Sequence, residues 1–369
     1  MGIALDKISI KGFKSIKELA GFELGNLNVL IGGNGAGKSN FIEIFRMLRA
    51  MVGLNFGAYV LDRGGADDFL YNGPKITKQI AAEFKFGLNG YSFVLEPTVD
   101  DKFLIKSEAH DFKFGQKWYF GSDGFESCLP IEKDKNGVTS PHGVGHYVYD
   151  SVSNWTVYHF HDTGNTAPMR RYEIIEDNKY LRSDAANIAA YLYKIKTRHK
   201  ETYQEIVDSI RTVTPFFDDF ILEPVKKGEK EKINLSWLQK GSDYPMQPYH
   251  FSDGTIRFIC LATALIQPYY PSIIIIDEPE LGLHPYAIDV LAELIKSASG
   301  ETQVIISTQS PALVNNFEPD DIVIVDRKDG ASTFNRLNKQ ELDNWLEEYA
   351  LGELWVKNIF SGGPVHEQS

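Results

Sequence analysis

The chain has 369 residues, of which 43% are hydrophobic and 24% charged, and it carries a formal net charge of −12. Such a composition is typical of a globular protein with one large or two modest domains, and the acidic excess argues against a broadly basic surface for nucleic acids. The two cysteines have no metal-ligand spacing, and the longest aliphatic run, residues 273–276, is too short to cross a bilayer. We expect a reduced, cytoplasmic protein without membrane contact.

The first fifty residues predict two short strands followed by a strand, a loop and a helix. Residues 5–10 and a second segment that ends near Leu24 form the first two strands. Residues 27–31 are a short apolar run, and residues 41–48 place apolar side chains at helical spacing, with the helix expected to end before Gly53. The loop between them fits G-x-x-x-x-G-K-[ST], so it has the strand–loop–helix context of a phosphate-binding P-loop (Walker A).

The residue types in this loop suit phosphate binding. Glycines let backbone N–H groups face the phosphates without a Cβ in the way, and the helix N-terminus adds its dipole. Lys38 would reach the β- and γ-phosphates of ATP, and the Ser39 hydroxyl would bind Mg²⁺. The alternative is a glycine-rich turn without a ligand, against which the later motifs argue. The predicted nucleotide-binding residues here are Gly32, Gly33, Asn34, Gly35, Ala36, Gly37, Lys38, Ser39 and Asn40.

From residue 79 the apolar period changes to two, which indicates β-structure. Residues 80–86 and 91–95 alternate and are joined by Asn89-Gly90, a pattern typical of a hairpin. Residues 103–105 and 155–160 predict further strands. Residues 111–145 show little periodicity and predict loops or an irregular insertion.

Two helices are predicted in the middle of the chain. Residues 184–195 share one apolar face with Asp184 as the expected N-cap, and residues 202–205 fit a capping box for a second helix that ends at Pro215. These helices either pack against the rest of the protein or form a partner-contacting arm. The basic stretch 194–200 is either a solvated face or a contact for nucleic acid.

A second phosphate-binding arrangement precedes a predicted apolar helix over residues 256–265. Ser252, Asp253 and Gly254 offer a hydroxyl, free backbone N–H groups and a helix dipole at its start. One P-loop domain gains nothing from a second γ-phosphate site unless two copies face each other. We therefore infer a composite site, with the P-loop from one subunit and residues 252–254 from the other.

Two buried strands are predicted to end in polar residues. Residues 273–276 are four isoleucines followed by Asp277 and Glu278, the pattern of a Walker B strand in a parallel sheet. Asp277 would hold Mg²⁺, and Glu278 would polarise the water that attacks the γ-phosphate. Residues 304–308 form the next strand, which places Gln309 near the γ-phosphate as a switch residue, and residues 322–326 add one more strand.

The order of these motifs resembles the ABC ATPases of the SMC/RecF/OLD type and, more closely, the stand-alone ATPases of the AAA_21 group. The resemblance spans nearly the whole chain, is weakest over residues 100–177, and includes the helical stretch around Asn187. It rests on the P-loop, Gly-Phe-Lys-Ser at 12–15, Ser-Asp-Gly-Thr at 252–255, Ile-Asp-Glu-Pro-Glu-Leu-Gly-Leu-His-Pro at 276–285, Ser-Thr-Gln-Ser-Pro at 307–311, and a tail at 351–355 and 362–364.

For the fold, the resemblance implies an α/β P-loop ABC-ATPase head with a mixed sheet, an antiparallel β subdomain and a helical insertion. Sustained heptads are absent, so no long coiled coil is expected. The expected division is an N-terminal ATPase lobe at 1–180, the helical insertion at 181–225 and a C-terminal ATPase lobe at 226–369.

For the site, the resemblance implies an ATP-driven head-to-head homodimer with two nucleotides between its subunits. Glu278 becomes the catalytic acid, Ser252 and Gly254 the signature supplied in trans, and residues 281–284 the loop that crosses the interface. Gln309 stands where many relatives have His; its amide can bind the γ-phosphate but cannot carry a charge, which bears on turnover and not on binding. Gln79 is, by order alone, the candidate for the family's Mg²⁺-contacting glutamine.

For the biological role, the resemblance implies DNA transactions and bacterial defence against phage. The chain ends soon after the ATPase tail, so we expect any nuclease or toxin that it controls to be a separate protein, with DNA as a candidate ligand. The alternative is a slow-turnover, nucleotide-gated scaffold or sensor. A nucleotide-binding subunit of a membrane transporter is disfavoured by the long interval from the P-loop to residues 252–254 and by the Gly-Phe-Lys-Ser start.

Overall fold

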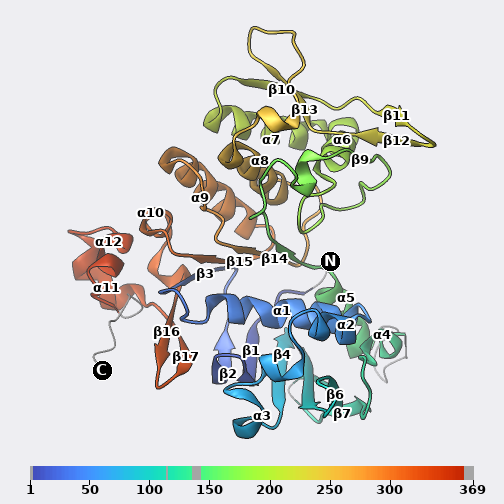
Figure 1. Ribbon diagram of the computed structural model, residues 1–369. Helices are drawn as coiled ribbons and strands as arrows, with labels where there is room; N and C mark the ends of the chain where they lie inside the picture. Colours follow the sequence, from blue (N-terminus) through green and yellow to red (C-terminus); the bar gives the residue numbers. More distant parts are fainter. Residues whose placement is uncertain (1–2, 114, 135–142, 361–369) are drawn as a thin grey trace.

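The computed structural model of the protein describes residues 3–113, 115–134 and 143–360. The part of the predicted tail motif at 362–364 lies outside these residues, as does 135–142 within the predicted irregular segment. Two six-stranded sheets enclose helix α1 (Lys38–Val52), and a second layer of helices covers the far face of one sheet (Figure 1).

The central sheet is mixed, as predicted, with strand order β17-β16-β3-β15-β14-β8. Every neighbouring pair is parallel except β16 with β17, which are antiparallel. Its strands are β3 (Leu27–Ile31), β8 (Trp155–Tyr158), β14 (Ile273–Asp277), β15 (Gln303–Thr308), β16 (Ile322–Lys328) and β17 (Ala331–Arg336).

The isoleucine run of β14 is buried on both faces of this sheet. Ile273 and Ile275 face the core around α1, whereas Ile274 and Ile276 face the core on the other side. Successive side chains of a strand point to opposite faces, so a strand covered on both sides needs a continuous apolar run. This is why the aliphatic runs at 27–31, 273–276 and 304–306 became central strands.

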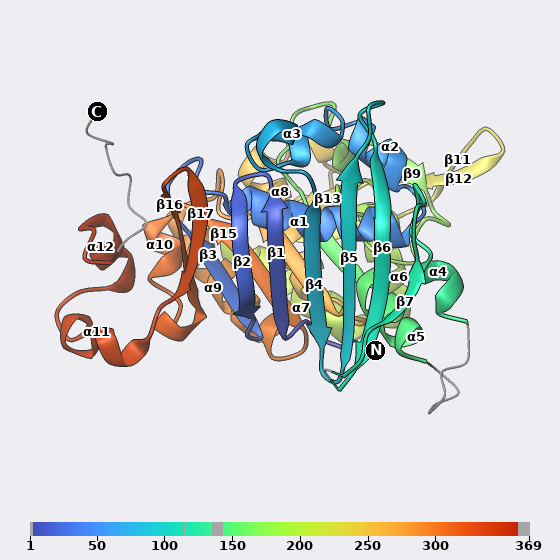
Figure 2. The same cartoon turned by 90° about the horizontal axis from the view of Figure 1, so that it is seen from below.

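The second sheet is the predicted antiparallel β subdomain (Figure 2). Its hairpin exists, but the two-residue turn is Gly87-Leu88, and Asn89 pairs with Phe86 inside the ladder. The predicted irregular segment also contains β7 and α4 (Leu129–Glu132). In spatial order the strands are β2 (Ile16–Glu23), β1 (Lys7–Phe13), β4 (Ile80–Phe86), β5 (Asn89–Pro97), β6 (Phe103–Phe112) and β7 (Trp118–Gly121).

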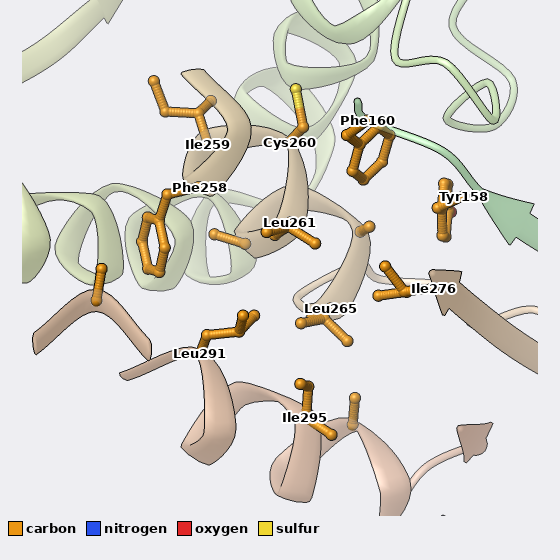
Figure 3. Packing of buried hydrophobic residues seen from close by; sticks show 14 of the residues in the cluster. Tyr158, Phe160, Phe258, Ile259, Cys260, Leu261, Leu265, Ile276, Leu291 and Ile295 are labelled. Atoms are coloured by element: carbon orange, nitrogen blue, oxygen red, sulfur yellow. The ribbon is translucent and has the colours of Figure 1, made fainter. Parts of the chain in front are cut away.

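Helices α8 (Asp253–Leu265) and α9 (Pro285–Ser299) pack on the face of the central sheet opposite α1. Figure 3 shows Leu261 and Leu265 of α8 close to Leu291 of α9 and Ile276 of β14. The other helices are α2 (Phe56–Leu61), α3 (Gly73–Ile76), α5 (Val144–Ser153), α6 (Ile188–Arg198), α7 (Lys200–Val213), α10 (Pro311–Val314), α11 (Lys339–Leu346) and α12 (Leu351–Val356). The longest described helices, α1 and α9, have 15 residues each.

The starts of the two middle helices differ from the predictions. Helix α6 is preceded by Asn187, whose side chain accepts from Arg182 N–H at 2.9 Å and donates to Tyr180 O at 2.8 Å, so Asp184 is not the N-cap. Helix α7 begins at Lys200, which places the expected capping box inside the helix.

The remaining strands form two small sheets, β10 (Phe217–Ile221) with β13 (Ser236–Gln239), and β11 (Val225–Lys227) with β12 (Lys230–Ile233) and β9 (Glu173–Ile174).

Candidate active site

The carboxyl ends of four parallel strands meet at one edge of the central sheet. Strand β3 leads into the P-loop, β15 into Gln309, β14 into Glu278, and β8 into residues 159–161. Because parallel neighbours end at the same edge, segments that are more than 200 residues apart in the chain come together here.

Two glycines of the P-loop pack closely against strands β16 and β17. Gly37 has φ +117, and a Cβ there would lie 2.1 Å from Ser332 Oγ; a Cβ on Gly32 would lie 2.1 Å from Val325 O. Strands β16 and β17 therefore support the loop from behind, and a side chain at either glycine would displace it.

The residue after Lys14 in the Gly-Phe-Lys-Ser segment ties the loop to the rest of the sheet. The Ser15 hydroxyl accepts from Asn40 Nδ2 at 2.7 Å and lies 2.7 Å from Ser332 Oγ, which donates to Ala36 O at 2.5 Å. These contacts hold the start of α1 and the loop in one arrangement. The sequence alone did not assign this role to Ser15.

Lys38 is buried at the centre of the loop, only 5% exposed. Its ammonium donates to Gly32 O at 2.6 Å and Gly33 O at 3.1 Å. Burial lowers the pKa of Lys38, while the carboxylates of Glu278 and Asp277 act to raise it. A buried ammonium with only carbonyl partners has charge left to give to an anion in the loop.

The acidic pair ends β14 in an ordered arrangement. Asp277 accepts a hydrogen bond from the Ser307 hydroxyl of the neighbouring strand. Glu278 has φ +48, a region that non-glycine residues rarely adopt, and its N–H donates to Ser307 O at 2.9 Å. The side-chain amide of Gln309 donates to the Glu278 carboxylate. Strain at such a position is typical of functional sites.

Glu280 is a further site residue that the sequence reasoning did not single out. Its Oε1 accepts from Thr308 Oγ1 at 2.6 Å and from Gln309 N–H at 3.1 Å, and within the described residues its buried Oε2 has no partner. Burial raises the pKa of Glu280, and the nearby charge of Glu278 adds to this. Glu280 thus positions the backbone of the switch residue.

His161, just after β8, also escaped the sequence reasoning. Its Nε2 is hydrogen-bonded to the carbonyl of Asp277 at 2.9 Å, which places it beside the Walker B strand. Gln79 lies elsewhere: its carbonyl packs against Gly12, next to the antiparallel sheet. The strand predicted at 155–160 is present as β8, but the sequence did not show that it pairs in parallel with β14, which is what brings His161 to this edge.

A cavity of about 160 Å³ joins the P-loop to Glu278 and Gln309. Among the described residues, Gly32, Ala36 and Asp277 stand outside its lining, as do residues 252–254. The lining is Gly33, Asn34, Gly35, Gly37, Lys38, Ser39, Asn40, Glu278 and Gln309. The structure therefore brings Glu278 and Gln309 to the P-loop and keeps the serine of α8 apart from it.

Ser252 is the N-cap of α8 and is exposed, and its hydroxyl accepts from Thr255 N–H at 3.1 Å. The adjoining loop is held by a buried Arg170, which donates to Pro248 O at 2.6 Å, Phe251 O at 3.1 Å and Asp253 at 2.9 Å. The N-terminus of α8 is thus rigidly supported and open to solvent.

The same helix is fixed to the loop that follows Walker B. A Cβ on Gly254 would lie 2.6 Å from Gly282 O, so the two glycines pack closely. Arg257 donates to Leu281 O, and also to Phe160 O and His161 O, both at 3.0 Å. These contacts hold the start of α8 against residues 281–282.

The residues present fit a nucleotide with a divalent cation. The loop lines an open cavity, and Lys38, which also lines it, supplies a positive charge there. Ser39 and Asp277 would supply hydroxyl and carboxylate oxygens, the ligands that Mg²⁺ prefers alongside phosphate and water.

The fold, together with the P-loop at the carboxyl edge of the central sheet, defines a P-loop ATPase domain with the architecture of SMC-head ABC ATPases, as predicted. The chain belongs to the family described as "AAA domain, putative AbiEii toxin, Type IV TA system", whose model matches residues 27–315. No curated protein matches the chain.

Two solved structures show the likeness of fold. An Smc head bound to the C-winged helix domain of ScpA has 17% identity and a TM-score of 0.55, over 92% of this chain and 99% of that chain. An Smc head domain with an extended coiled coil, bound to the C-terminal domain of ScpA and derived from Pyrococcus furiosus, has 17% identity and a TM-score of 0.54, over 94% and 99%. Within the described part of this chain, each helix is too short or too polar to span a membrane.

Proposed function

We propose that this ATPase hydrolyses ATP at a site shared by two copies of the chain. The single observation that carries the proposal is the separation of the two phosphate-binding arrangements. Ser252 and the start of α8 are exposed and stand outside the cavity that the P-loop lines. A second copy facing the first would place its residues 252–254 over the P-loop, which completes both sites by symmetry.

In the proposed reaction, P-loop N–H groups and Lys38 bind the phosphates, and Glu278 accepts a proton from the attacking water. Gln309 orients that water or the γ-phosphate through its amide. Mg²⁺, held by Ser39 and Asp277, would neutralise charge on the phosphate oxygens. The Gln309 bond to Glu278 supports these roles, because it fixes the carboxylate in the cavity.

We further propose that the ATPase controls a separate effector, such as a nuclease or toxin, in DNA-linked defence or repair. The family description names a toxin and a toxin–antitoxin system, and the similar Smc heads are bound to domains of ScpA. Within the chain we propose lobes at 1–180 and 226–369 with an insertion at 181–225.

A slow-turnover sensor is the second candidate. The amide of Gln309 donates to the same carboxylate that would accept the proton, so this hydrogen bond occupies an acceptor position that the attacking water would otherwise use. This observation favours slow hydrolysis and long-lived ATP complexes. The two candidates differ in turnover with and without DNA or effector.

The shared site is tested by mixing two variants. Lys38→Ala removes the phosphate-binding ammonium, and Ser252→Arg places a bulky cation at the start of α8, so each variant alone should be inactive. In a mixed dimer, one site has both defects and the other has neither. Random pairing should restore roughly a quarter of the wild-type turnover per chain. No recovery, with dimers shown to form, would mean that both groups act within one chain.

A further inference from the structure

A cavity of about 640 Å³ lies at the β8 edge of the central sheet, apart from the P-loop cavity. Helices α1 and α2 form one wall, and the segment at 180–184 forms the other. The two cavities have no lining residue in common. Its lining is Arg46, Arg49, Tyr59, Arg63, Thr156, Val157, His159, Tyr180, Leu181, Arg182, Ser183 and Asp184.

Four guanidinium groups converge on this cavity in a protein whose net charge is −12. Two of them share one carboxylate: Arg46 and Arg63 contact Glu43 at 3.0 and 2.6 Å. Arg182 contacts Asp177 at 2.7 Å. Each of these pairs occupies one nitrogen of its guanidinium, so other N–H donors of the same groups stay available to a ligand.

Arg49 differs from the other three. Across the residues that the structure describes, its guanidinium has no carboxylate within 4 Å and donates no hydrogen bond to the protein. Its side chain reaches solvent through the cavity, yet the surrounding protein desolvates the guanidinium enough to lower the pKa of Arg49. A guanidinium that lines a cavity and has no partner in the protein keeps its N–H donors available to an incoming anion.

The cavity also offers an aromatic surface. Tyr180 is 65% exposed, so much of its side chain is open to contact. The ring of Tyr59 is covered by Arg63, whose guanidinium carbon lies 3.9 Å from the ring centroid, and its hydroxyl donates to Glu43 at 2.5 Å. Tyr59 therefore holds two charged groups in place, and Tyr180 is the ring left for a ligand.

We propose that this cavity binds a phosphorylated small molecule of nucleotide size, with its phosphates on Arg49 and the neighbouring guanidiniums and its ring against Tyr180. The volume lies within the range of small-molecule sites. A concave pocket favours a compact ligand, and the negative charge of the whole protein opposes a long polyanion such as nucleic acid.

The cavity is connected to the Walker B strand by direct contacts. His159 lines it, and its ring centroid lies 4.2 Å from that of His161, which is bonded to the Asp277 carbonyl. Burial lowers the pKa of His159, and His161 and Arg46 add to this. Only His159 and His161 would therefore stand between a ligand on Arg46 and Arg49 and the end of β14.

The test uses the full chain with Lys38→Ala, so that the P-loop does not dominate binding. Calorimetric titration with AMP and, separately, with inorganic pyrophosphate should show saturable binding with about one site per chain. Adding Arg49→Ala should weaken AMP binding roughly tenfold or more, the effect of losing a charge-assisted hydrogen bond. Arg49→Lys keeps the charge but loses the planar guanidinium, so its affinity for AMP should fall between those of the protein with Arg49 and the Arg49→Ala variant. Arg327→Ala, at an exposed arginine of β16, is the matched control and should change nothing.

The proposal fails if neither AMP nor pyrophosphate binds the Lys38→Ala protein, or if Arg49→Ala leaves AMP binding unchanged while the protein melts as before. It is also overturned if short duplex DNA binds in an Arg49-dependent way and AMP does not, because the site would then serve nucleic acid. Binding is measured without ATP hydrolysis, so the outcome is independent of the proposed two-subunit reaction.

Discussion

The side-chain amide of Gln309 donates a hydrogen bond to the carboxylate of Glu278, which joins the ends of β15 and β14 across the mouth of the P-loop. The carboxylate of Glu280 accepts a hydrogen bond from the backbone N–H of the same Gln309, with 3.1 Å between Oε1 and the nitrogen. The acid and the switch are therefore positioned together. A change in either should alter hydrolysis far more than nucleotide binding.

Gln309→Ala removes the amide that donates to Glu278 and that, in the proposed reaction, orients the water or the γ-phosphate. We expect kcat to fall by on the order of 10²-fold with the KM for ATP within about twofold, because the amide acts where charge develops and not where ATP is first bound. Steady-state kinetics over a range of ATP concentrations measures both values. An increase in kcat would instead show that the amide restrains Glu278, as the sensor alternative requires.

Gly37→Ala should abolish ATP binding, because its Cβ would lie 2.1 Å from Ser332 Oγ. Gly35→Ala is the matched control: Gly35 also has positive φ, at +78, but a Cβ there meets nothing within 4 Å. Gly35→Ala should introduce only the strain of a left-handed alanine, about 1–2 kcal/mol, so this variant should keep a measurable affinity for ATP. Equilibrium binding of a fluorescent ATP analogue compares the two. Equal losses would mean that the close contact with Ser332 is unimportant.

Arg170→Met should destabilise the protein by about 2–6 kcal/mol, since it leaves the buried carbonyls of Pro248 and Phe251 without their donor. Asp253→Asn removes only the exposed end of the same ion pair and should cost under about 1 kcal/mol. Urea denaturation gives both values. If the two variants were equally stable, Arg170 would not be what holds the start of α8.

Glu280→Gln should stabilise the protein at pH 7–8. Burial raises the pKa of Glu280 above its usual 4.5, so the folded state holds this proton more tightly than the unfolded state. Stability is therefore lost as pH rises from about 4.5 through the raised folded-state pKa, and the loss is complete above it. The neutral amide avoids that loss, so the variant should melt a few degrees higher at pH 8, with a smaller gain at pH 5. A gain that is equal at both pH values would contradict the assignment.

The strands that carry the site were predictable because they are buried on both faces. In a chain with a P-loop, the continuous aliphatic runs of β3, β14 and β15 predict central strands of a parallel sheet. The parallel pairing of these strands brings the P-loop, Glu278 and Gln309 together. The hairpin turn was misplaced because Asn-Gly is a turn signal in isolation. Here Gly87 takes the positive φ of +56, and Asn89 is used in the ladder.

The residues that were missed act through tertiary contacts. Glu280 and His161 matter because of what lies beside them, the backbone of Gln309 and the carbonyl of Asp277, and neither neighbour is near in sequence to its partner. The arginine cavity is a similar case: Arg49 and Arg182 meet only after α1 and the 180–184 segment pack on either side of β8. Local sequence patterns do not predict such contacts, because they join residues that are far apart in the chain.

In the proposed dimer, ATP joins two copies of the chain through Ser252 of one and the P-loop of the other. The most direct test is the native mass of the Glu278→Gln protein with and without ATP and Mg²⁺, since this variant keeps the phosphate cradle and loses the carboxylate that would accept the proton. We predict a doubling of mass with ATP and Mg²⁺ that Ser252→Arg abolishes. A protein that stays monomeric at saturating ATP and Mg²⁺ would contradict the two-subunit site.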